Sequence, residues 1–542
     1  MKPTFTRSRR QFLQHSASLL AVAALPNWVQ AMENHPISAA GKASSNFHPD
    51  VEIDLICQPA SVAILPGQAT RVLQYQAKLI KGPAHTITPI PGSYLGPTLR
   101  FETGQKIRIK LYNGLDQATI THWHGLHVPA EMDGSPMYAI NQGQTFVYEF
   151  EMRNRASMNI YHPHPHNLTA SQVYQGLAGA IIVNDDEERR LELPSGEYEI
   201  PLVIQDRQFD SQNQLHYALH RHERMMGFYG DQILVNGQAK PSLKLANRAY
   251  RFRIMNGSTA RIYKLAWDDN SPVTVIGCDG GLLEAPITKP YVMLAPGERI
   301  DVWADFSGRK IGSQITLKSL AFSGALPKMA SMMSGRHGMH GGMHNSDLAM
   351  GSEYPILNIR IDRHSGESPS LPSTLSQIKR YSLKDTANPN QPVPIAISES
   401  PMAMLLNGRS YAENDIQAFE RIPLNSIQLL EIFHSQGGHA GHGMGGMAGM
   451  GGMGMMSMPH PIHLHGQYFQ ILSRSIETEH SDAYATVKDG LIDSGWKDTV
   501  LVMPGERIKL IKPFADFKGL FMYHCHNLEH EDMGMMREFL VE

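Results

Sequence analysis

Four His-x-His pairs are the residues of this 542-residue sequence best suited to chemistry. Alternate residues of a β-strand point to the same face, about 7 Å apart, so a pair within a strand directs two imidazoles at one place. Two pairs lie in the N-terminal third and two in the C-terminal third: His122 and His124, His162 and His164, His463 and His465, and His524 and His526. If their strands face each other, eight imidazoles converge. That number suits zinc, copper or iron, exceeds the needs of one ion, and fits three coppers.

The last pair encloses one of only three cysteines, in "HCHNLEHEDMGMM" at 524–536. In an extended segment Cys525 points away from its two neighbours, so its thiol faces a second place across the strand. Other ligands are available nearby: His460, His530 and Met535, with Met533 or Met536 as alternatives to the last. One thiolate, two imidazoles and a long axial thioether describe a blue-copper electron-transfer site.

A β framework is predicted to position these ligands. The stretches 106–113, 250–256 and 315–322 alternate, or nearly alternate, between polar and apolar residues, and Gly, Pro and Asn recur between such stretches. Long amphipathic helical windows are scarce. The pattern favours an all-β protein built from sandwich domains.

An internal repeat suggests how many domains there are. "LAPGERIDVWADF" at 294–306 matches "VMPGERIKLIKPF" at 502–514. Repeats about 200 residues apart are too long for solenoid units and indicate duplicated domains. We expect three copies, over residues 46–187, 190–366 and 370–542.

The second and third expected domains each contain a segment rich in Gly, Met and His, at 329–350 and 434–458. Such segments have too little branched apolar surface to form a packed core. We expect both to be mobile loops.

Four motifs in this sequence resemble those of the multicopper oxidases: "HWHGLHVP", "HPHPH", "HPIHLHG" and "HCHNLEHEDMGMM". The likeness extends over nearly the whole chain after its N-terminal segment, and it is strongest to the periplasmic cuprous oxidases of bacteria, which have laccase-like activity. The resemblance implies three cupredoxin-like Greek-key β-sandwich domains, four coppers per chain, and the reduction of O₂ to water.

Matched position by position, the resemblance also implies the copper ligands. The type 1 copper would be bound by His460, Cys525, His530 and Met535. The type 2 copper would be bound by His122 and His463. The two type 3 coppers would be bound by His124, His162, His164, His465, His524 and His526. No ligand position is substituted in this sequence.

Reduction of O₂ to water consumes four protons, and two carboxylates are expected to relay them to the cluster. The resembling family has proton-relay carboxylates at the positions of Asp133 and Glu531. A carboxylate near a copper cluster can pass protons through ordered water.

Two electron donors stay open as substrates. Met455, Met456 and Met458 lie within five residues of His460, and thioethers are soft ligands that prefer Cu(I). We therefore expect oxidation of Cu(I) for copper detoxification, with laccase-like oxidation of phenols and aromatic amines as the alternative. A non-catalytic copper-sequestering protein is a third hypothesis, which the complete ligand set disfavours. The acidic residue that flanks the methionine of the substrate entry site in the resembling oxidase falls here at Met456, so its substrate residues cannot be transferred.

The N-terminal segment 1–31 has the features of a twin-arginine signal peptide: Arg9-Arg10, a short apolar run, and "VQA" at 29–31. We expect export by the twin-arginine machinery to the periplasm, no membrane span, and a monomer. The net charge of −3 gives no reason to expect nucleic acid as a partner. Three cysteines cannot form a disulfide framework, although a bridge between Cys57 and Cys278 stays open.

Overall fold

The computed structural model describes residues 41–218, 220–327, 348–400, 403–434 and 457–542. The expected signal peptide and most of the two Met/His-rich segments lie outside these ranges, so the structure does not address the prediction that the segments are mobile. The described residues form six β-sheets with only short helices between them, which confirms the all-β prediction.

Two sheets form the first sandwich. One has the order β2-β1-β5-β7, with β1 Val51–Val62, β2 Thr70–Lys81, β5 Lys106–Asn113 and β7 Thr145–Glu151. The other has the order β3-β4-β9-β8-β6, with β3 Ile87–Thr88, β4 Thr98–Glu102, β6 Thr121–His124, β8 Ser157–Pro163 and β9 Gly179–Asn184. Strand β1 pairs parallel to β5 and antiparallel to β2, so the chain crosses between sheets in the manner of a Greek key.

The second sandwich repeats this arrangement with more strands. Its larger sheet has the order β12-β11-β10-β14-β19-β16-β17, with β10 Glu199–Arg207, β11 Gln232–Val235, β12 Gln238–Ala239, β14 Ala249–Asn256, β16 Val273–Cys278, β17 Gly281–Lys289 and β19 Arg299–Asp305. Its smaller sheet has the order β13-β21-β20-β15-β18, with β13 Ser242–Ala246, β15 Tyr263–Trp267, β18 Val292–Leu294, β20 Gln314–Ser319 and β21 Tyr354–Arg363.

The third sandwich holds the C-terminal strands. One sheet has the order β23-β22-β25-β29-β27, with β22 Val393–Ser400, β23 Ala403–Leu406, β25 Ser426–His434, β27 Gln470–Ile476 and β29 Glu506–Phe514. The other has the order β24-β31-β30-β26-β28, with β24 Arg421–Ile422, β26 His460–Leu464, β28 Thr499–Val502, β30 Gly519–Cys525 and β31 Met536–Val541. The α-helices of the described chain are α2 Thr169–Gln175, α3 Asp186–Arg189, α4 Arg221–Met226, α6 Ser481–Ala485 and α7 Leu528–Asp532.

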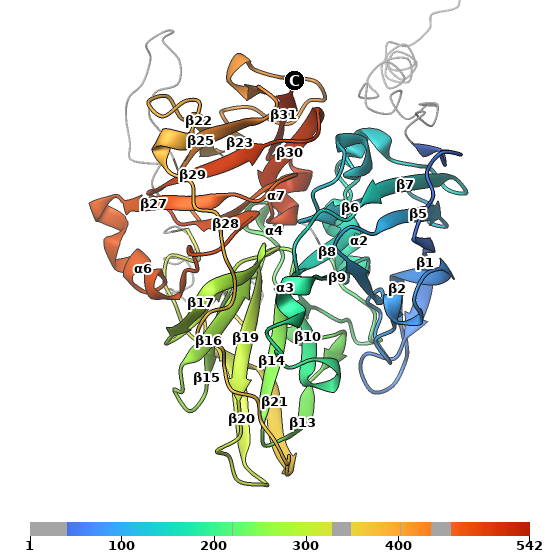
Figure 1. Ribbon diagram of the computed structural model, residues 1–542, viewed down its shortest axis with the longest axis vertical. Coiled ribbons are helices and arrows are strands. Elements are labelled where there is room, and N and C mark those ends of the chain that lie inside the picture. Colours follow the sequence, from blue (N-terminus) through green and yellow to red (C-terminus); the bar gives the residue numbers. More distant parts are fainter. Residues whose placement is uncertain (1–40, 219, 328–347, 401–402, 435–456) are drawn as a thin grey trace, which may run out of the picture.

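Each sandwich buries an apolar cluster of its own, and the three sandwiches pack around a common centre (Figure 1). The first and third lie side by side, with α7 between them, and the second lies beneath both. Asp532 at the end of α7 accepts hydrogen bonds from the backbone N–H groups of Thr169 and Ala170 in α2, each at 3.0 Å. These bonds tie the third sandwich to the first beside the histidine motifs.

Strand β14 shows how the second sandwich is fastened to the rest. Its alternating sequence suggests one polar face, yet every residue of the strand is buried. Arg251 and Arg253 both form ion pairs with Glu188 of α3, the helix that links the first two sandwiches, and both also contact Asp301. Burial of these cations is tolerated because each has anionic partners.

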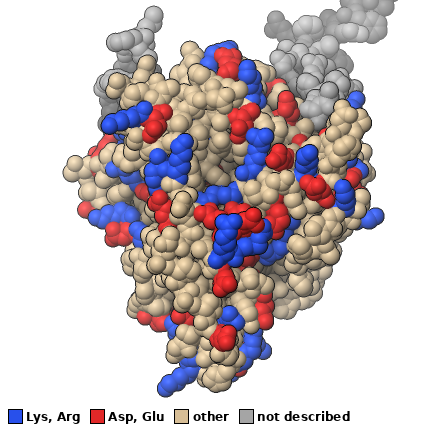
Figure 2. All heavy atoms as spheres, viewed as in Figure 1, with Lys and Arg blue, Asp and Glu red and all other residues tan. Residues whose placement is uncertain are grey.

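Two further sequence predictions meet the structure. Cys57 and Cys278 are free and buried in the cores of different sandwiches, so they do not form a bridge. None of the helices in the described ranges has the length and apolar character needed to cross a membrane. Figure 2 shows acidic and basic side chains interspersed over the visible face.

Candidate metal centres

Two neighbouring strands place ligands on both of their faces. Strands β26 and β30 are antiparallel, with His463 opposite His524 and Ile462 opposite Cys525. Residues directly opposite share a face of the sheet, and successive residues alternate between faces. The histidines of this ladder therefore lie on one side and the thiol of Cys525 on the other.

The thiol side forms a compact three-residue group. The Sγ atom of Cys525 lies 3.4 Å from Nδ1 of His460 and 3.6 Å from Nδ1 of His530. The Nε2 atom of His460 donates to Oε1 of Glu399 at 2.7 Å, and that of His530 donates to the Met225 carbonyl at 3.1 Å. Because each Nε2 carries the ring proton, each Nδ1 turns a lone pair toward the sulfur.

Met535 belongs to the same buried apolar cluster as Cys525, whereas Met533 is only half-buried. The backbone N–H of Cys525 donates to the Met535 carbonyl at 3.0 Å, which holds the two residues together. A thiolate, two imidazoles and a nearby thioether form a donor set suited to copper.

The opposite side gathers all eight histidines of the four pairs at the boundary between the first and third sandwiches, and all eight are buried. In the first sandwich His122 of β6 lies opposite His162 of β8. Rings from the two sandwiches stack: His122 on His465 with centroids 3.9 Å apart, and His124 on His463 with centroids 3.6 Å apart. The structure therefore brings together the residues that the sequence singled out.

The hydrogen bonds of these rings show what they can bind. Nδ1 of His122 donates to the Asp133 carbonyl at 2.6 Å, Nδ1 of His162 to the Pro163 carbonyl at 2.8 Å, and Nδ1 of His463 to the Asp498 carbonyl at 2.9 Å. Their Nε2 atoms are buried and have no hydrogen-bond partner among the described residues. An unpaired buried nitrogen is costly unless it binds something, and a metal ion is what a set of such nitrogens can share.

His465 and His524 give a second indication. Their Nε2 atoms lie 3.1 Å apart, while Nδ1 of His465 donates to Asp133 and Nδ1 of His524 lies 3.1 Å from the Cys525 carbonyl. With the ring protons on Nδ1, two lone pairs face each other across this gap. Such an arrangement is repulsive unless a cation lies between the nitrogens, so the residues present fit a metal cluster.

Burial keeps these imidazoles in the form that binds metal. Burial and, after it, the charge of neighbouring imidazoles lower the pKa of His162 and of His463 to about 3, against the opposing effect of nearby carboxylates. Neutral imidazole is the ligand form of histidine, so the cluster does not need to lose protons to bind metal near neutral pH.

The two predicted proton-relay acids flank the cluster. Oδ2 of Asp133 lies 2.7 Å from Nδ1 of His465, and Oε2 of Glu531 lies 3.1 Å from Nδ1 of His524. Both carboxylates are buried, at 3% and 1% exposure, so neither is a surface acid. Burial alone would raise the pKa of Glu531, but the imidazoles of His164 and His524 outweigh it and lower this pKa well below the usual range.

Sequence reasoning missed two acids that contact the ligands. Oδ1 of Asp498 lies 3.1 Å from Nε2 of His124, and Glu399 contacts His460. Asp498 lies only 35 residues from His463 along the chain, in a stretch that resembles the family. The sequence could therefore have identified Asp498 as a contact of the ligands. Glu399 is 61 residues from His460 on another strand, and no local pattern marks it. Two further histidines of these motifs lie outside the cluster: His127 of "HWHGLHVP" contacts Asp516, and His166 of "HPHPH" contacts Tyr411.

Comparison with known proteins agrees with this chemistry. Two family models, each described as "Multicopper oxidase", match residues 72–188 and 450–542 respectively. The chain is 30% identical over 451 residues to multicopper oxidase mco of Staphylococcus haemolyticus, covering 83% of each protein. It is 28% identical to a laccase of Bacillus stratosphericus, over 82% of this chain and 89% of the laccase. The crystal structure of McoA multicopper oxidase from Aquifex aeolicus superposes with a TM-score of 0.72 at 29% identity, covering 92% of this chain and 97% of that one.

These relatives confirm the predictions of three cupredoxin-like domains, of copper as cofactor at four ions per chain, and of an oxidase that uses O₂ as electron acceptor. They favour an enzyme over the hypothesis of a non-catalytic copper store. This chain belongs to the multicopper oxidases.

Proposed function

We propose that this multicopper oxidase oxidises Cu(I) to Cu(II) outside the cytoplasm and that it oxidises phenols as a second activity. The type 1 copper is bound by His460, Cys525, His530 and Met535. The type 2 copper is bound by His122 and His463, and the type 3 pair by His124, His162, His164, His465, His524 and His526. The contacts of these residues, together with the unpartnered imidazole nitrogens, support the assignment.

Bound copper supplies four one-electron redox centres, the number of electrons that reduction of O₂ to water requires. The chain orients these centres and manages the protons. Cys525 is bonded through the backbone to His524 and His526, so one strand joins the electron-accepting site to the cluster. Oδ2 of Asp133 and Oε2 of Glu531 each face a protonated ring nitrogen of a cluster histidine, so both carboxylates are placed to accept protons and pass them on.

One observation carries the proposal of Cu(I) as substrate: a buried anion at the outer edge of His460. Oε1 of Glu399 accepts hydrogen bonds from Nε2 of His460 at 2.7 Å, from Nε2 of His434 at 3.2 Å, and from the backbone N–H of Met458 at 3.1 Å. Burial would raise the pKa of Glu399, but the hydrogen bonds from both histidines outweigh it and lower this pKa to about 2. A permanent negative charge beside the electron-accepting histidine attracts a cation and gives no advantage to a neutral phenol.

The connectivity around Glu399 agrees with a soft cationic substrate. His434 ends β25, and Ser457 and Met458 come just before β26. The described residues that flank the sequence 435–456, His434 before it and Met458 after it, both contact this carboxylate. The resembling oxidase has an acidic residue at the position that Met456 occupies here. In this chain Glu399, on another strand, supplies a carboxylate near the same site.

Steady-state O₂ consumption with Cu(I) and with a phenol, measured on Glu399→Gln, tests the proposal. Glutamine keeps an acceptor for His460 but removes the charge. We expect KM for Cu(I) to rise about 10-fold, the loss of roughly 1.4 kcal/mol of attraction, with little change for the phenol. Glu431→Gln is the matched control, because Glu431 lies on β25 and pairs with Arg507 instead. Equal losses for both substrates in Glu399→Gln would contradict a substrate role.

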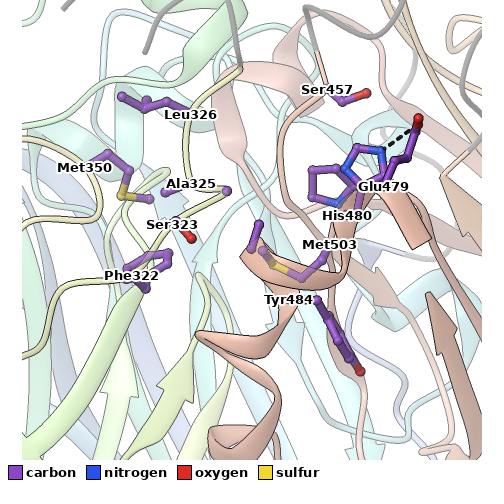
Figure 3. Close-up of a pocket in the computed structure, with 13 residues that line it drawn as sticks. Phe322, Ser323, Ala325, Leu326, Met350, Ser457, Glu479, His480, Tyr484 and Met503 are labelled. Carbon is purple, nitrogen blue, oxygen red and sulfur yellow. Dashed lines mark ion pairs between the residues drawn. The ribbon is translucent and has the colours of Figure 1, made fainter. Parts of the chain in front are cut away.

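A pocket supports the second activity (Figure 3). A cavity of about 320 Å³ lies between the second and third sandwiches, where Phe322, Leu326 and Met350 line one side and His480 and Met503 the other. This volume and mixed lining suit a small aromatic molecule. Met503 follows Val502, which pairs with His460 across the β26–β28 ladder, so the pocket lies close to the proposed type 1 ligand.

A filling substitution, Leu326→Trp, tests the pocket. We expect KM for the phenol to rise at least severalfold while KM for Cu(I) stays unchanged, the reverse of Glu399→Gln. If phenol turnover is unaffected, the phenol reaches the type 1 site by another route.

Export and domain boundaries complete the proposal. We propose that segment 1–31 directs twin-arginine export of the protein to the periplasm and is then cleaved off. The protein is a monomer with domains at 46–187, 190–366 and 370–542. The six sheets fall into three groups within these ranges, which supports the boundaries. Replacing Arg9 and Arg10 together by lysine should retain the protein in the cytoplasm, as cell fractionation would show.

A further inference from the structure

One side chain of the second sandwich reaches the histidine cluster, although none of the proposed copper ligands comes from that sandwich. Arg299 begins β19 and is buried, at 1% exposure. Its Nη1 donates to Oδ1 of Asp498 at 2.7 Å, and its Nη2 donates to Oδ2 of the same carboxylate at 2.6 Å. This is the two-pronged geometry that makes arginine–carboxylate pairs strong and directional.

The rest of the guanidinium is fixed as well. Nε of Arg299 donates to the Met158 carbonyl at 2.9 Å, in β8 of the first sandwich, and Nη1 also donates to the Gly297 carbonyl at 2.9 Å. Asp498 belongs to the third sandwich, just before β28. Arg299 therefore bonds to all three sandwiches at once.

Asp498 transmits this contact to two imidazoles. Its Oδ1 lies 3.1 Å from Nε2 of His124, and its carbonyl accepts from Nδ1 of His463 at 2.9 Å. The two rings come from different sandwiches and stack on each other. Asp498 thus sets both the orientation and the proton position of each ring, and Arg299 sets the orientation of Asp498.

We infer that Arg299 is a positioning residue for the oxygen-reducing cluster, through which the second domain, itself without copper ligands, controls the geometry of His124 and His463. The inference rests on the proposed ligand assignment. Without the two-pronged contact, the Asp498 carboxylate keeps the hydrogen bond from Thr499 but loses the partners that fix its plane. His124 then loses a fixed acceptor, and its ring can rotate away from the metal.

The internal repeat contains a natural contrast. Both copies of "PGERI" build the same turn: Oε2 of Glu298 accepts from the backbone N–H of Ala295 at 2.8 Å, and Oε2 of Glu506 accepts from that of Met503 at 2.8 Å. The arginines differ. Arg507 is half-exposed and pairs with Glu431 on the surface of its own sandwich. The turn therefore does not require the arginine to bind a cluster group, and the role of Arg299 follows from its position among the three sandwiches.

Arg299→Lys in the full-length, copper-loaded enzyme tests the inference, with Arg507→Lys as the matched control. Lysine keeps the charge but cannot form the two-pronged contact. We expect Arg299→Lys to keep the blue absorption and the rate at which a donor reduces the type 1 copper. We expect it to alter the electron paramagnetic resonance signal of the type 2 copper, and to slow reoxidation by O₂ about 10- to 100-fold, the usual effect of losing a partner of a metal ligand. Arg507→Lys should match the wild type in every measurement.

A second variant separates positioning from simple support of the fold. Asp498→Asn keeps the shape of the side chain and should produce the same change at the type 2 copper with a normal blue absorption. The double variant should lose less than the sum of the two single losses, because both act through one contact. Thermal melting of the metal-free variants gives their Tm values, which show whether a substitution also destabilises the fold.

Three results would overturn the inference. The first is an unchanged type 2 signal and O₂ rate in Arg299→Lys. The second is additive losses in the double variant. The third is a parallel fall of both copper signals in Asp498→Asn with a lower Tm, which would show that the contact only supports the fold. Failure of the ligand assignment itself would appear differently, as a wild-type enzyme without blue absorption or four coppers.

Discussion

The two candidate metal regions share strands β26 and β30 but are assembled differently. On one face, the thiol of Cys525 meets His460 and His530, and all three belong to the third sandwich. On the other face, four histidines of the third sandwich meet four of the first. The ligands of a site within one sandwich come together when that sandwich folds, although Met225 of the second sandwich also contacts His530. A site between sandwiches needs docking, and its rings depend on partners such as Asp133, Asp498 and Glu531 that hold them across the boundary.

The largest effect is expected from breaking the single-sandwich site alone. Cys525→Ser removes the thiolate, so the blue absorption should disappear and oxidase activity should fall to background, because electrons no longer reach the cluster. The cluster coppers should stay, since the eight histidines are untouched. Optical and paramagnetic spectra with copper analysis would measure this, and a variant that stays blue would show that Cys525 is not the ligand.

Breaking the site between the sandwiches should give the complementary result. His162→Ala removes one imidazole of the cluster and should lower copper below about four per chain, while the blue absorption remains. O₂ reduction should fail even when a donor can still reduce the type 1 copper. Full copper content with normal turnover would contradict the convergence of the four pairs on one cluster. His166→Ala is the control, because that ring contacts Tyr411 edge-on, outside the cluster.

A smaller effect is expected from the acids that flank the cluster. Glu531→Gln and Asp133→Asn keep the shape of each side chain but cannot pass protons, so O₂ reduction should slow by about 100-fold, a typical contribution of general acid catalysis. Reduction of the type 1 copper should be nearly unchanged, and rapid-mixing kinetics separate the two steps. Equal slowing of both steps would assign the acids a structural role.

The smallest effect is expected at Cys278, a cysteine outside both metal regions. Cys278 is buried in the second sandwich, where its thiol donates to the Trp496 carbonyl at 3.2 Å and burial raises its pKa to about 12. Cys278→Ala should leave the blue absorption and copper content unchanged and cost no more than about 2 kcal/mol of stability. Thermal melting and copper analysis would check this. A loss of copper would show that the Cys278 thiol affects copper binding, which its contacts do not indicate.

Much of the fold and of the site follows from local geometry. Alternation of residues along a strand is a property of the backbone, so "HCH" and "HLH" each had to present two imidazoles to one side, and Cys525 had to face the other. Each motif that resembles the multicopper oxidases is also one short continuous stretch of the chain. For this reason the family, the all-β class and copper could be predicted from the amino-acid sequence alone.

Only the tertiary structure decided which groups hold the ligands in place. Glu399 reaches His460 from β22, Met225 reaches His530 from the second sandwich, and Arg299 reaches Asp498 through the contact of three sandwiches. The sequence marks none of these partners, because a hydrogen bond across a domain boundary depends on docking angles that no local pattern encodes. The two "PGERI" turns illustrate this limit. The same five residues build the same turn twice, but the packing of the sandwiches places Arg299 against Asp498 beside the cluster and Arg507 against Glu431 at the surface.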